Sequence, residues 1–171
     1  MKTIEFNPLS KKSVLHAKRE ILRYKKDLEQ KFEKFVNELK NTGFEILNAK
    51  ISAIPPVYRG DIVPHVELGG SQGKYTIKLI LSGSDVAFVE FGTGITFNGS
   101  AGSSPHPKGA EMGMLIGEYG KKQGAKPTGW FFTNQYGDVE HTYGIPMQAP
   151  LFFTSKELKE KIESIARKVW G

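Results

Sequence analysis

The side chains best suited to metal binding or acid–base catalysis are the four histidines, and the sequence scatters them. His16, His65, His106 and His141 lie far apart, and no two of them have the spacing of metal ligands on one helix. The chain contains no cysteine, so neither a thiolate zinc site nor a disulfide can form. A single histidine in a strand or loop is more often structural or solvated than catalytic. The histidines therefore predict neither a metal site nor a catalytic base.

The carboxylates are equally scattered, and their spacing selects no two of them for one acid–base site. Glu90 stands out because the apolar residues Val89 and Phe91 flank it. Two interpretations of Glu90 stay open. It is either an ordinary capping or ion-pair carboxylate, or a buried contact across a subunit boundary, where an unpaired charge would be costly. The other acidic residues considered are Asp61, Glu67, Asp85, Glu111, Glu118, Asp138 and Glu140.

The glycine-rich motifs do not fit nucleotide-binding loops. If residues 70–75 formed a phosphate-binding loop, its first glycine would fall on Leu68 and its magnesium-binding Ser or Thr on Tyr75. The glycines at 92, 94 and 99 do not follow a strand and open a helix, as a dinucleotide site requires. We therefore predict no cofactor, and the sequence favours a protein that is not an enzyme.

Positive charge is concentrated near the N-terminus. The chain has a net charge of +6, and residues 8–42 contain ten Lys or Arg against five Asp or Glu. A basic stripe can bind phosphates, but the interleaved acidic residues are typical of a solvated helix face. Aromatic residues further along could stack on bases: Trp130, Phe131, Phe132 and Tyr143. A nucleic-acid-binding module that uses the basic N-terminal helix is thus the alternative function.

Length and composition predict a single globular domain over residues 1–171. Charged residues make up 25% of the chain and hydrophobic residues 39%, which is ordinary for a folded protein. The N-terminus lacks the apolar core of a signal peptide, and no run is long and apolar enough to span a membrane. We therefore expect a protein that is made in the cytosol and has no membrane partner.

Two long helices are predicted to frame the chain. The first runs from Pro8 to Thr42, with Asn7 as N-cap and Gly43 as the stop. Packing of its apolar stripe on the protein's own sheet is favoured over coiled-coil pairing with another chain. The second begins at a capping box over residues 154–157. The apolar residues of the two stripes are Ile21, Leu28, Phe32, Phe35, Val36 and Leu39, and then Leu158, Ile162, Ile165 and Val169.

Strands are predicted between the two helices. Strand-like patterns cover residues 44–54, 62–68, 75–81, 130–135 and 139–143, with turns at 69–73 and 136–138. A short helix over residues 86–91 follows the potential caps Ser84 and Asp85. The expected fold class is α+β. An antiparallel β-sheet carries a long N-terminal helix and a C-terminal helix packed on it, together with a long glycine-rich loop.

The glycine-rich loop is predicted to span residues 95–128 and to be flexible. Nine glycines lie from Gly94 to Gly129, and no helix or strand period is present. Loops of this length are uncommon inside compact domains and are usually functional or disordered. Apolar residues inside the loop would be costly to expose, which indicates a docking surface formed by Met112, Met114, Leu115, Ile116 and Tyr119.

The order of these segments resembles a family of bacteriophage tail-completion or head–tail joining proteins. These are small neck proteins, or minor tail components, of long-tailed phages and prophages. Each motif is short, and it is their order and spacing that carry the resemblance over residues 10–170. One departure is the uninterrupted N-terminal helix, which relatives can break into two. The matching motifs are Phe88-Val89-Glu90-Phe91-Gly92-Thr93-Gly94, Pro55-Pro56-Val57-Tyr58-Arg59-Gly60, His106-Pro107, Ile116-Gly117-Glu118-Tyr119-Gly120, Gly129-Trp130-Phe131-Phe132 and Gly144-Ile145-Pro146-Met147-Gln148-Ala149-Pro150-Leu151.

This resemblance implies a structural virion protein rather than an enzyme. Family members act at the phage head–tail junction or tail end and assemble as a ring, usually of six, during tail completion or head–tail joining. The implied partners are other copies of the chain and other phage neck or tail proteins. The implied locations are the virion and, during assembly, the host cytoplasm. Candidates for the assembly interface are Phe88, Glu90, Phe91, Gly92, Thr93, Met112, Met114, Leu115, Ile116, Tyr119, Trp130 and Phe132.

Overall fold

The computed structural model describes residues 3–71, 74–92, 106–109, 111, 130–133, 136–142 and 144–171. Its helices are α1 (Lys11–Ala53), α2 (Pro56–Arg59), α3 (Val86–Phe91) and α4 (Pro150–Trp170). Its strands are β1 (Val63–Ser71), β2 (Lys74–Ser82), β3 (Trp130–Thr133) and β4 (Val139–Thr142), which pair as two antiparallel hairpins. The predicted α+β class is confirmed, whereas most of the predicted loop 95–128 lies outside the described residues.

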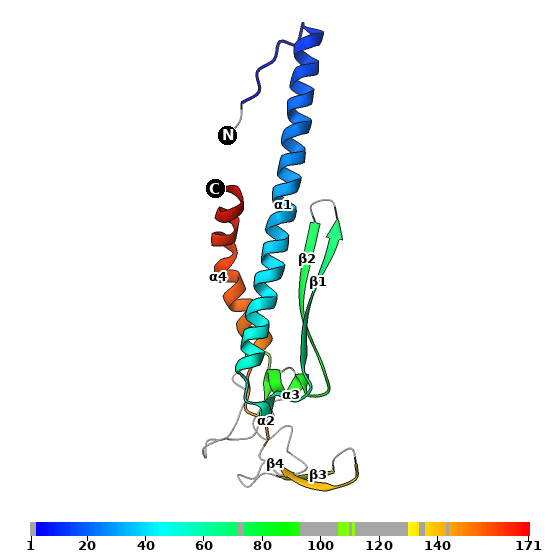
Figure 1. Ribbon diagram of the computed structural model, residues 1–171, viewed down its shortest axis with the longest axis vertical. Coiled ribbons are helices and arrows are strands. Elements are labelled where there is room, and N and C mark those ends of the chain that lie inside the picture. The colour runs from blue at the N-terminus through cyan, green and yellow to red at the C-terminus, as the bar shows by residue number, and fades with distance from the viewer. Residues whose placement is uncertain are drawn as a thin grey trace.

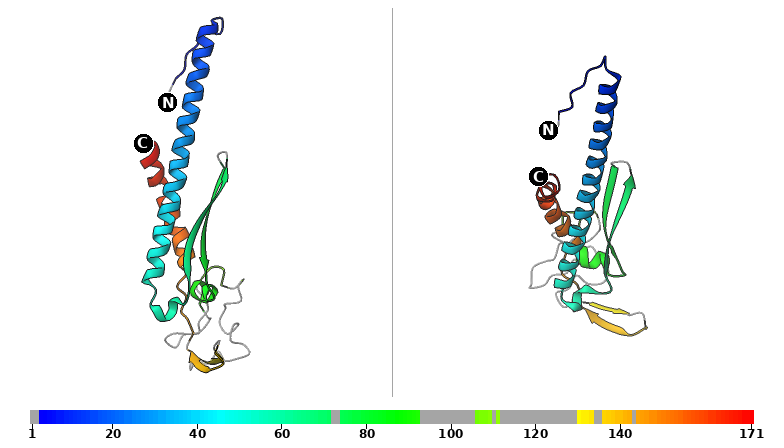
Figure 2. Two further views of the ribbon diagram at one scale, coloured as in Figure 1. Left: turned by 45° about the vertical axis from the view of Figure 1, so that its right-hand side comes forward. Right: turned by 45° about the horizontal axis from the view of Figure 1, so that its top comes forward.

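Helix α1 is the spine of the molecule. Its 43 residues extend over about 64 Å at the usual rise per residue. Helix α4 packs antiparallel to the C-terminal half of α1, and the β1–β2 hairpin lies along another side of that half (Figures 1 and 2). The N-terminal half of α1 projects beyond both of these elements (Figure 1). The protein is therefore elongated, with a packed body at one end of α1 and a projecting helix at the other.

Helix α1 extends further toward the C-terminus than the sequence predicts. The predictions that Gly43 ends this helix and that residues 44–54 form a strand are wrong. Gly43 is buried, and a Cβ at this position would lie 3.2 Å from Leu158 Cδ2 and from Leu79 Cδ2. The glycine therefore lets α4 and β2 approach α1 closely. Beyond it, buried residues continue at helical spacing, namely Ile46, Leu47 and Ile51.

The ends of α1 also differ from the prediction that Asn7 and Pro8 begin the helix. Ser10 is the N-cap, and its Oγ accepts a hydrogen bond from Ser13 N at 3.3 Å. The Asn7 side chain instead accepts a hydrogen bond from Leu9 N at 2.9 Å, in the turn before the helix. At the other end, the helix stops where Pro55 and Pro56 follow, because proline has no N–H to donate.

The β1–β2 hairpin is confirmed and is longer than predicted. Its register pairs Val63 with Ser82 and Ser71 with Lys74, so the connection is shorter than the predicted turn 69–73. Along β2 exposed and half-buried residues alternate from Lys74 to Leu79, as expected of a strand with one covered face. The alternating pattern in the sequence thus identified the strand correctly.

The hydrophobic core lies where the end of α1 meets α3 and the base of the β1–β2 hairpin. Leu47 and Val89 are fully buried at its centre. The short helix α3 is confirmed with the bounds expected from the sequence, and it carries Val89 into this cluster. The buried members of the core are Leu47, Ile51, Ile54, Ile62, Leu81 and Val89, and they are joined at the edge by Tyr58, Leu79, Val86 and Leu151.

Helix α4 and the β3–β4 hairpin complete the described structure. The predicted helix is confirmed, but it begins at Pro150 rather than at the capping box, and Thr154 is fully buried inside it. Proline suits the first turn of a helix, whose N–H groups have no partner within the helix. The β3–β4 hairpin is confirmed, with Trp130 paired to Thr142. None of the described helices is long and apolar enough to cross a membrane.

Candidate functional site

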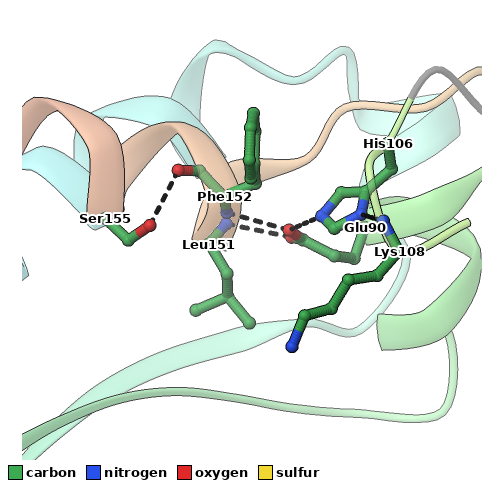
Figure 3. Close-up of polar contacts among 6 residues, drawn as sticks. All are labelled: Glu90, His106, Lys108, Leu151, Phe152 and Ser155. Atoms are coloured by element: carbon green, nitrogen blue, oxygen red, sulfur yellow. Dashed lines mark hydrogen bonds and ion pairs between the residues drawn. The ribbon is translucent and has the colours of Figure 1, made fainter.

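Glu90 and His106 form a buried polar cluster at the start of α4 (Figure 3). Glu90 Oε2 accepts a hydrogen bond from Leu151 N and Oε1 accepts one from Phe152 N, both at 2.9 Å. His106 Nε2 lies 3.3 Å from Glu90 Oε1, and the two side chains are 7% and 6% exposed. A carboxylate this deeply buried requires such partners, because loss of hydration disfavours its charge. These three partners, Leu151, Phe152 and His106, lie far from Glu90 in the sequence.

Glu90 supplies the cap that α4 lacks in its local sequence. Ala149 precedes the helix in the left-handed conformation, with φ of 46°, and its methyl group cannot accept a hydrogen bond. The N–H groups of the second and third helical residues would otherwise be unpaired. The Glu90 carboxylate satisfies both and places negative charge at the positive end of the helix dipole. This cap joins residues 61 positions apart, so it is a tertiary contact.

His106 brings a distant part of the chain to the same cap. Lys108 N donates a hydrogen bond to His106 Nδ1 at 3.0 Å. Since Nδ1 accepts, the ring carries its proton on Nε2, which faces Glu90. The ring lies edge-on to Phe91 and Phe152, with centroids 4.6 and 5.0 Å away. His106 is therefore a structural histidine that links the segment 106–109 to α3 and α4.

The backbone strengthens this junction beside Glu90. Gln148 N and Ala149 N both donate hydrogen bonds to Val89 O, at 2.9 and 3.3 Å. Gly92 ends α3 with φ of 77°, and a Cβ at this position would lie 2.9 Å from Met147 N. A glycine is therefore required both by the backbone conformation and by the close approach of the returning chain. We call this junction of α3, residues 106–109 and the start of α4 the α4 clasp.

Two further carboxylates, the exposed Asp61 and the half-buried Glu157, connect other elements of the body. Asp61 accepts hydrogen bonds from Ser84 N and from Ser84 Oγ, the shortest at 2.9 Å. The bond from Ser84 N contributes most to holding the pKa of Asp61 below its usual 3.8. Glu157 lies 2.9 Å from Lys50 Nζ and 3.2 Å from Lys161 Nζ, which ties α4 to α1. The hydrogen bond from Lys50, followed by that from Lys161, likewise lowers the pKa of Glu157.

The polar groups of the α4 clasp are arranged to hold neighbouring parts of the fold together. Both oxygens of Glu90 are engaged by backbone N–H groups, and His106 uses both ring nitrogens for contacts. Within the described ranges, no group of three or more His, Cys, Asp or Glu residues is arranged to hold a metal ion. The clasp can fix the direction in which α4 and the preceding chain leave α3.

The predicted interface residues around α3 belong to the α4 clasp. Phe88 and Phe91 are half-buried, and Glu90 and Gly92 are buried. For Glu90 the capping interpretation is confirmed by its bonds to Leu151 N and Phe152 N. A contact between this region and another subunit stays a prediction.

The other predicted interface residues lie on β3 or outside the described residues. Trp130 and Phe132 are in β3, and Phe131 between them is 69% exposed. Val139 and Tyr136 of the same hairpin are also largely exposed. The remaining candidates lie outside the described residues: Thr93, Met112, Met114, Leu115, Ile116 and Tyr119.

The sequence analysis missed a larger exposed surface on the projecting part of α1, residues 11–31, which we call the arm. Ile21 and Leu28 do not pack on the protein's own sheet as predicted, and they remain 56% and 46% exposed. Of the arm's hydrophobic residues, all of which the structure describes, only Ala17 is buried. The other exposed apolar residues of the arm are Val14, Leu15, Leu22 and Tyr24. A seven-residue spacing of Val14, Ile21 and Leu28 was the available signal.

A shallow apolar groove runs along the arm beside the N-terminal residues. Its volume is about 310 Å³, and it is open to solvent. Ile4 and Phe6 border it on one side, and α1 supplies the rest of its lining with Val14, Ala17, Lys18, Ile21 and Leu22. The groove therefore has the apolar character of a surface that receives side chains from another molecule.

The comparisons with known proteins return no relative. No protein-family model, curated protein or solved structure matches this chain.

Proposed function

We propose that this chain is a structural virion protein that acts at the head–tail junction or tail end of a long-tailed phage. In this proposal it assembles as a ring with other copies of itself during tail completion or head–tail joining. The resemblance in the order of its motifs supports the phage context. The observation that carries the assembly role is the arm, which exposes apolar residues along a helix that α4 and the β1–β2 hairpin do not reach (Figure 1).

The architecture suits assembly better than turnover of a small molecule. The polar groups with defined geometry in the described residues, Glu90, His106 and Asp61, bond to neighbouring parts of the same fold. Groups of exposed apolar residues lie on the arm and on the β3–β4 hairpin, at the two ends of the long molecule (Figure 1), and others lie singly on the body between them. Exposed apolar clusters of this kind mark protein–protein contacts.

Deletion of the gene from its phage or prophage tests the proposed function. We expect electron microscopy of the lysate to show separate DNA-filled heads and unattached tails, and the wild-type gene supplied in trans to restore joined particles. A copy carrying Glu67→Gln, at an exposed position of β1, is the matched control and should restore joining equally well. Normal particles in the deletion lysate would reject the joining role.

Nucleic-acid binding by the arm is the second candidate function. Residues 11–31 carry eight basic and three acidic side chains, a net charge of +5 out of +6 for the chain. Binding of this origin should weaken steeply as salt rises, because it releases counterions from the phosphates. Titration of double-stranded DNA with the full chain at several salt concentrations measures this dependence. No binding at low salt would remove this candidate.

A further inference from the structure

The uncovered face of the arm is the continuation of the face that α1 buries in the body. Eighteen residues make about five turns of an α-helix, so residues separated by 18 point in the same direction. Val14, Ile21 and Leu28 therefore share the azimuths of Phe32, Leu39 and Ile46. In the body this face is covered, with Ile46 buried and the Phe32 ring 5.6 Å from that of Tyr75. In the arm, neither α4 nor the β1–β2 hairpin reaches this face (Figure 2); Ile4 and Phe6 border it on one side, and Val14, Ile21 and Leu28 stay exposed.

The arm repeats apolar residues at the spacing of a coiled-coil seam. Val14, Ile21 and Leu28 lie seven residues apart and occupy one core position of the heptad, the a position. Ala17 and Tyr24 occupy the second core position, d, so the seam is apolar from Val14 to Leu28. Lys31 takes the next d position and ends the apolar run. The groove beside Val14, Ala17 and Ile21 provides a hollow on this seam for a side chain of a facing helix.

The charges that flank the seam select an identical helix in parallel orientation. Lys18 and Lys25 fall on one flank, the e position, while Glu20 and Asp27 fall on the other, the g position. In a parallel pair of arms, each g residue faces the e residue five positions later on the partner, which brings Glu20, already hydrogen-bonded to Arg23 of its own helix at 2.9 Å, beside the partner's Lys25. In an antiparallel pair, e would face e and g would face g, so like charges would meet. The parallel arrangement thus brings one pair of opposite charges together, Glu20 and the partner's Lys25, whereas the antiparallel one would bring like charges together.

Each arm carries a net charge of +5, so two arms repel each other at long range. Lys12, Arg19 and Lys26 occupy the f position, on the side of the helix opposite the seam. Side chains at f point away from the partner helix. Salt at physiological strength screens exposed charges beyond about 8 Å. The pairing should therefore grow tighter as salt rises.

We infer that the arm pairs in parallel and in register with the arm of a second copy of this chain, through Val14, Ile21, Tyr24 and Leu28. This inference deepens the proposed function, because it names a surface through which copies assemble. A parallel pairing also directs the bodies of both copies to the same end of the paired arms. Parallel arms are compatible with cyclic symmetry around a common axis, whereas antiparallel arms would place the bodies at opposite ends.

Single cysteines in the full chain test the pairing directly, because the natural sequence has none. We expect Val14→Cys and, separately, Leu28→Cys to form disulfide-linked dimers under mild oxidation. The control is Lys26→Cys on the opposite side of the arm, where we expect cross-linking to be about tenfold slower because the paired sulfurs would lie out of reach. All three positions are exposed, and circular dichroism should confirm that each variant keeps its helix content.

The outcomes separate the alternatives. Equal cross-linking at Val14, Leu28 and Lys26 would overturn the inference. So would efficient cross-linking only between a Val14→Cys chain and a Leu28→Cys chain, because that pairing is antiparallel. Self-association measured by sedimentation should strengthen with salt; DNA binding without cross-linking, weakened by salt, would assign the arm to nucleic acid instead.

The same variants distinguish this inference from the proposed function. If the cysteines fail to cross-link while gene deletion still leaves heads and tails unjoined, the arm pairing is wrong and the joining role stands. If the cysteines cross-link but the deletion lysate contains normal particles, the arm pairing stands and the joining role falls.

Discussion

The two halves of α1 belong to one continuous helix but have different surroundings. In residues 32–53, α4 and the β1–β2 hairpin cover one face, and Val36, Leu47 and Ile51 are buried. In the arm, an apolar stripe of similar spacing stays exposed. Amphipathic periodicity therefore specifies the helix in both halves, whereas burial depends on whether other elements reach it. The exposed stripe of the arm is the part of α1 on which the proposed pairing rests.

The net charge of α1 also differs between the arm and residues 32–53. The half within the body carries three basic and three acidic residues, so its net charge is zero, whereas the arm carries a net charge of +5. Residues that pack against neighbours of the same chain are thus electrically balanced. The basic surplus lies where the helix is exposed.

The largest expected effect comes from truncating the packed half. Leu47 is fully buried at the centre of the core, so Leu47→Ala should lower the free energy of unfolding by about 3 kcal/mol, through lost burial and the cavity left behind. Urea denaturation followed by circular dichroism measures this change. A loss below about 1 kcal/mol, the size typical of an average substitution, would show that residues 32–53 are not tightly packed and so do not differ from the arm in this respect.

The next effect tests whether the body depends on the α4 clasp. Glu90→Ala removes the acceptor of two backbone N–H groups at a buried helix start, so we expect a loss of about 2 kcal/mol of stability. Glu67→Ala, at an exposed position of β1, is the control and should change stability little. Equal unfolding midpoints for the two variants would contradict the role given to Glu90.

Acid should weaken the body through Asp61. The hydrogen bonds from Ser84 lower the pKa of Asp61 in the folded state, so the folded protein holds this carboxylate ionised more strongly than the unfolded chain does. The resulting stabilisation is present above the unfolded pKa and is lost as pH falls through the lower, folded one. Thermal unfolding of the wild type and Asp61→Asn between about pH 6 and pH 2 measures it. Their midpoints should converge in acid, and a constant difference would contradict this assignment.

The smallest expected effect on folding is in the arm. Because Leu28 is about half exposed, Leu28→Ala should change the stability of the dilute monomer by about 0.5 kcal/mol or less. The same substitution should weaken self-association, since it removes a seam residue. Urea denaturation at low protein concentration and sedimentation at high concentration separate the two quantities. A stability loss as large as that of Leu47→Ala would erase the contrast between the halves.

Local patterns predicted most of the secondary structure, and tertiary contacts explain where they failed. The alternation along β2 and the apolar spacing of α4 depend on neighbouring residues, so the sequence was sufficient. Gly43 looks like a helix stop, and only the proximity of Leu158 and Leu79 explains a glycine inside α1. The start of α4 was misplaced for a similar reason, because its cap comes from Glu90.

The candidate site was predicted only in part. The sequence marked Glu90 as unusual, but its partners Leu151 and Phe152 lie 61 and 62 residues away, and no spacing rule connects them. The arm was present in the sequence as a heptad repeat. The sequence pattern is similar in a buried and in an exposed apolar stripe, so it could not show that the arm is exposed. The exposure became evident only from the structure, in which α1 extends beyond the hairpin and α4.

The α4 clasp has a consequence for how this protein can change during evolution. After Gly92 the chain meets α3 again at two points. His106 contacts Glu90, and Gln148 N donates a hydrogen bond to the carbonyl of Val89. In general, doubling the length of a flexible connection whose two ends are fixed costs only about 0.6 kcal/mol. Insertions and deletions between these contacts would leave the core and the cap in place.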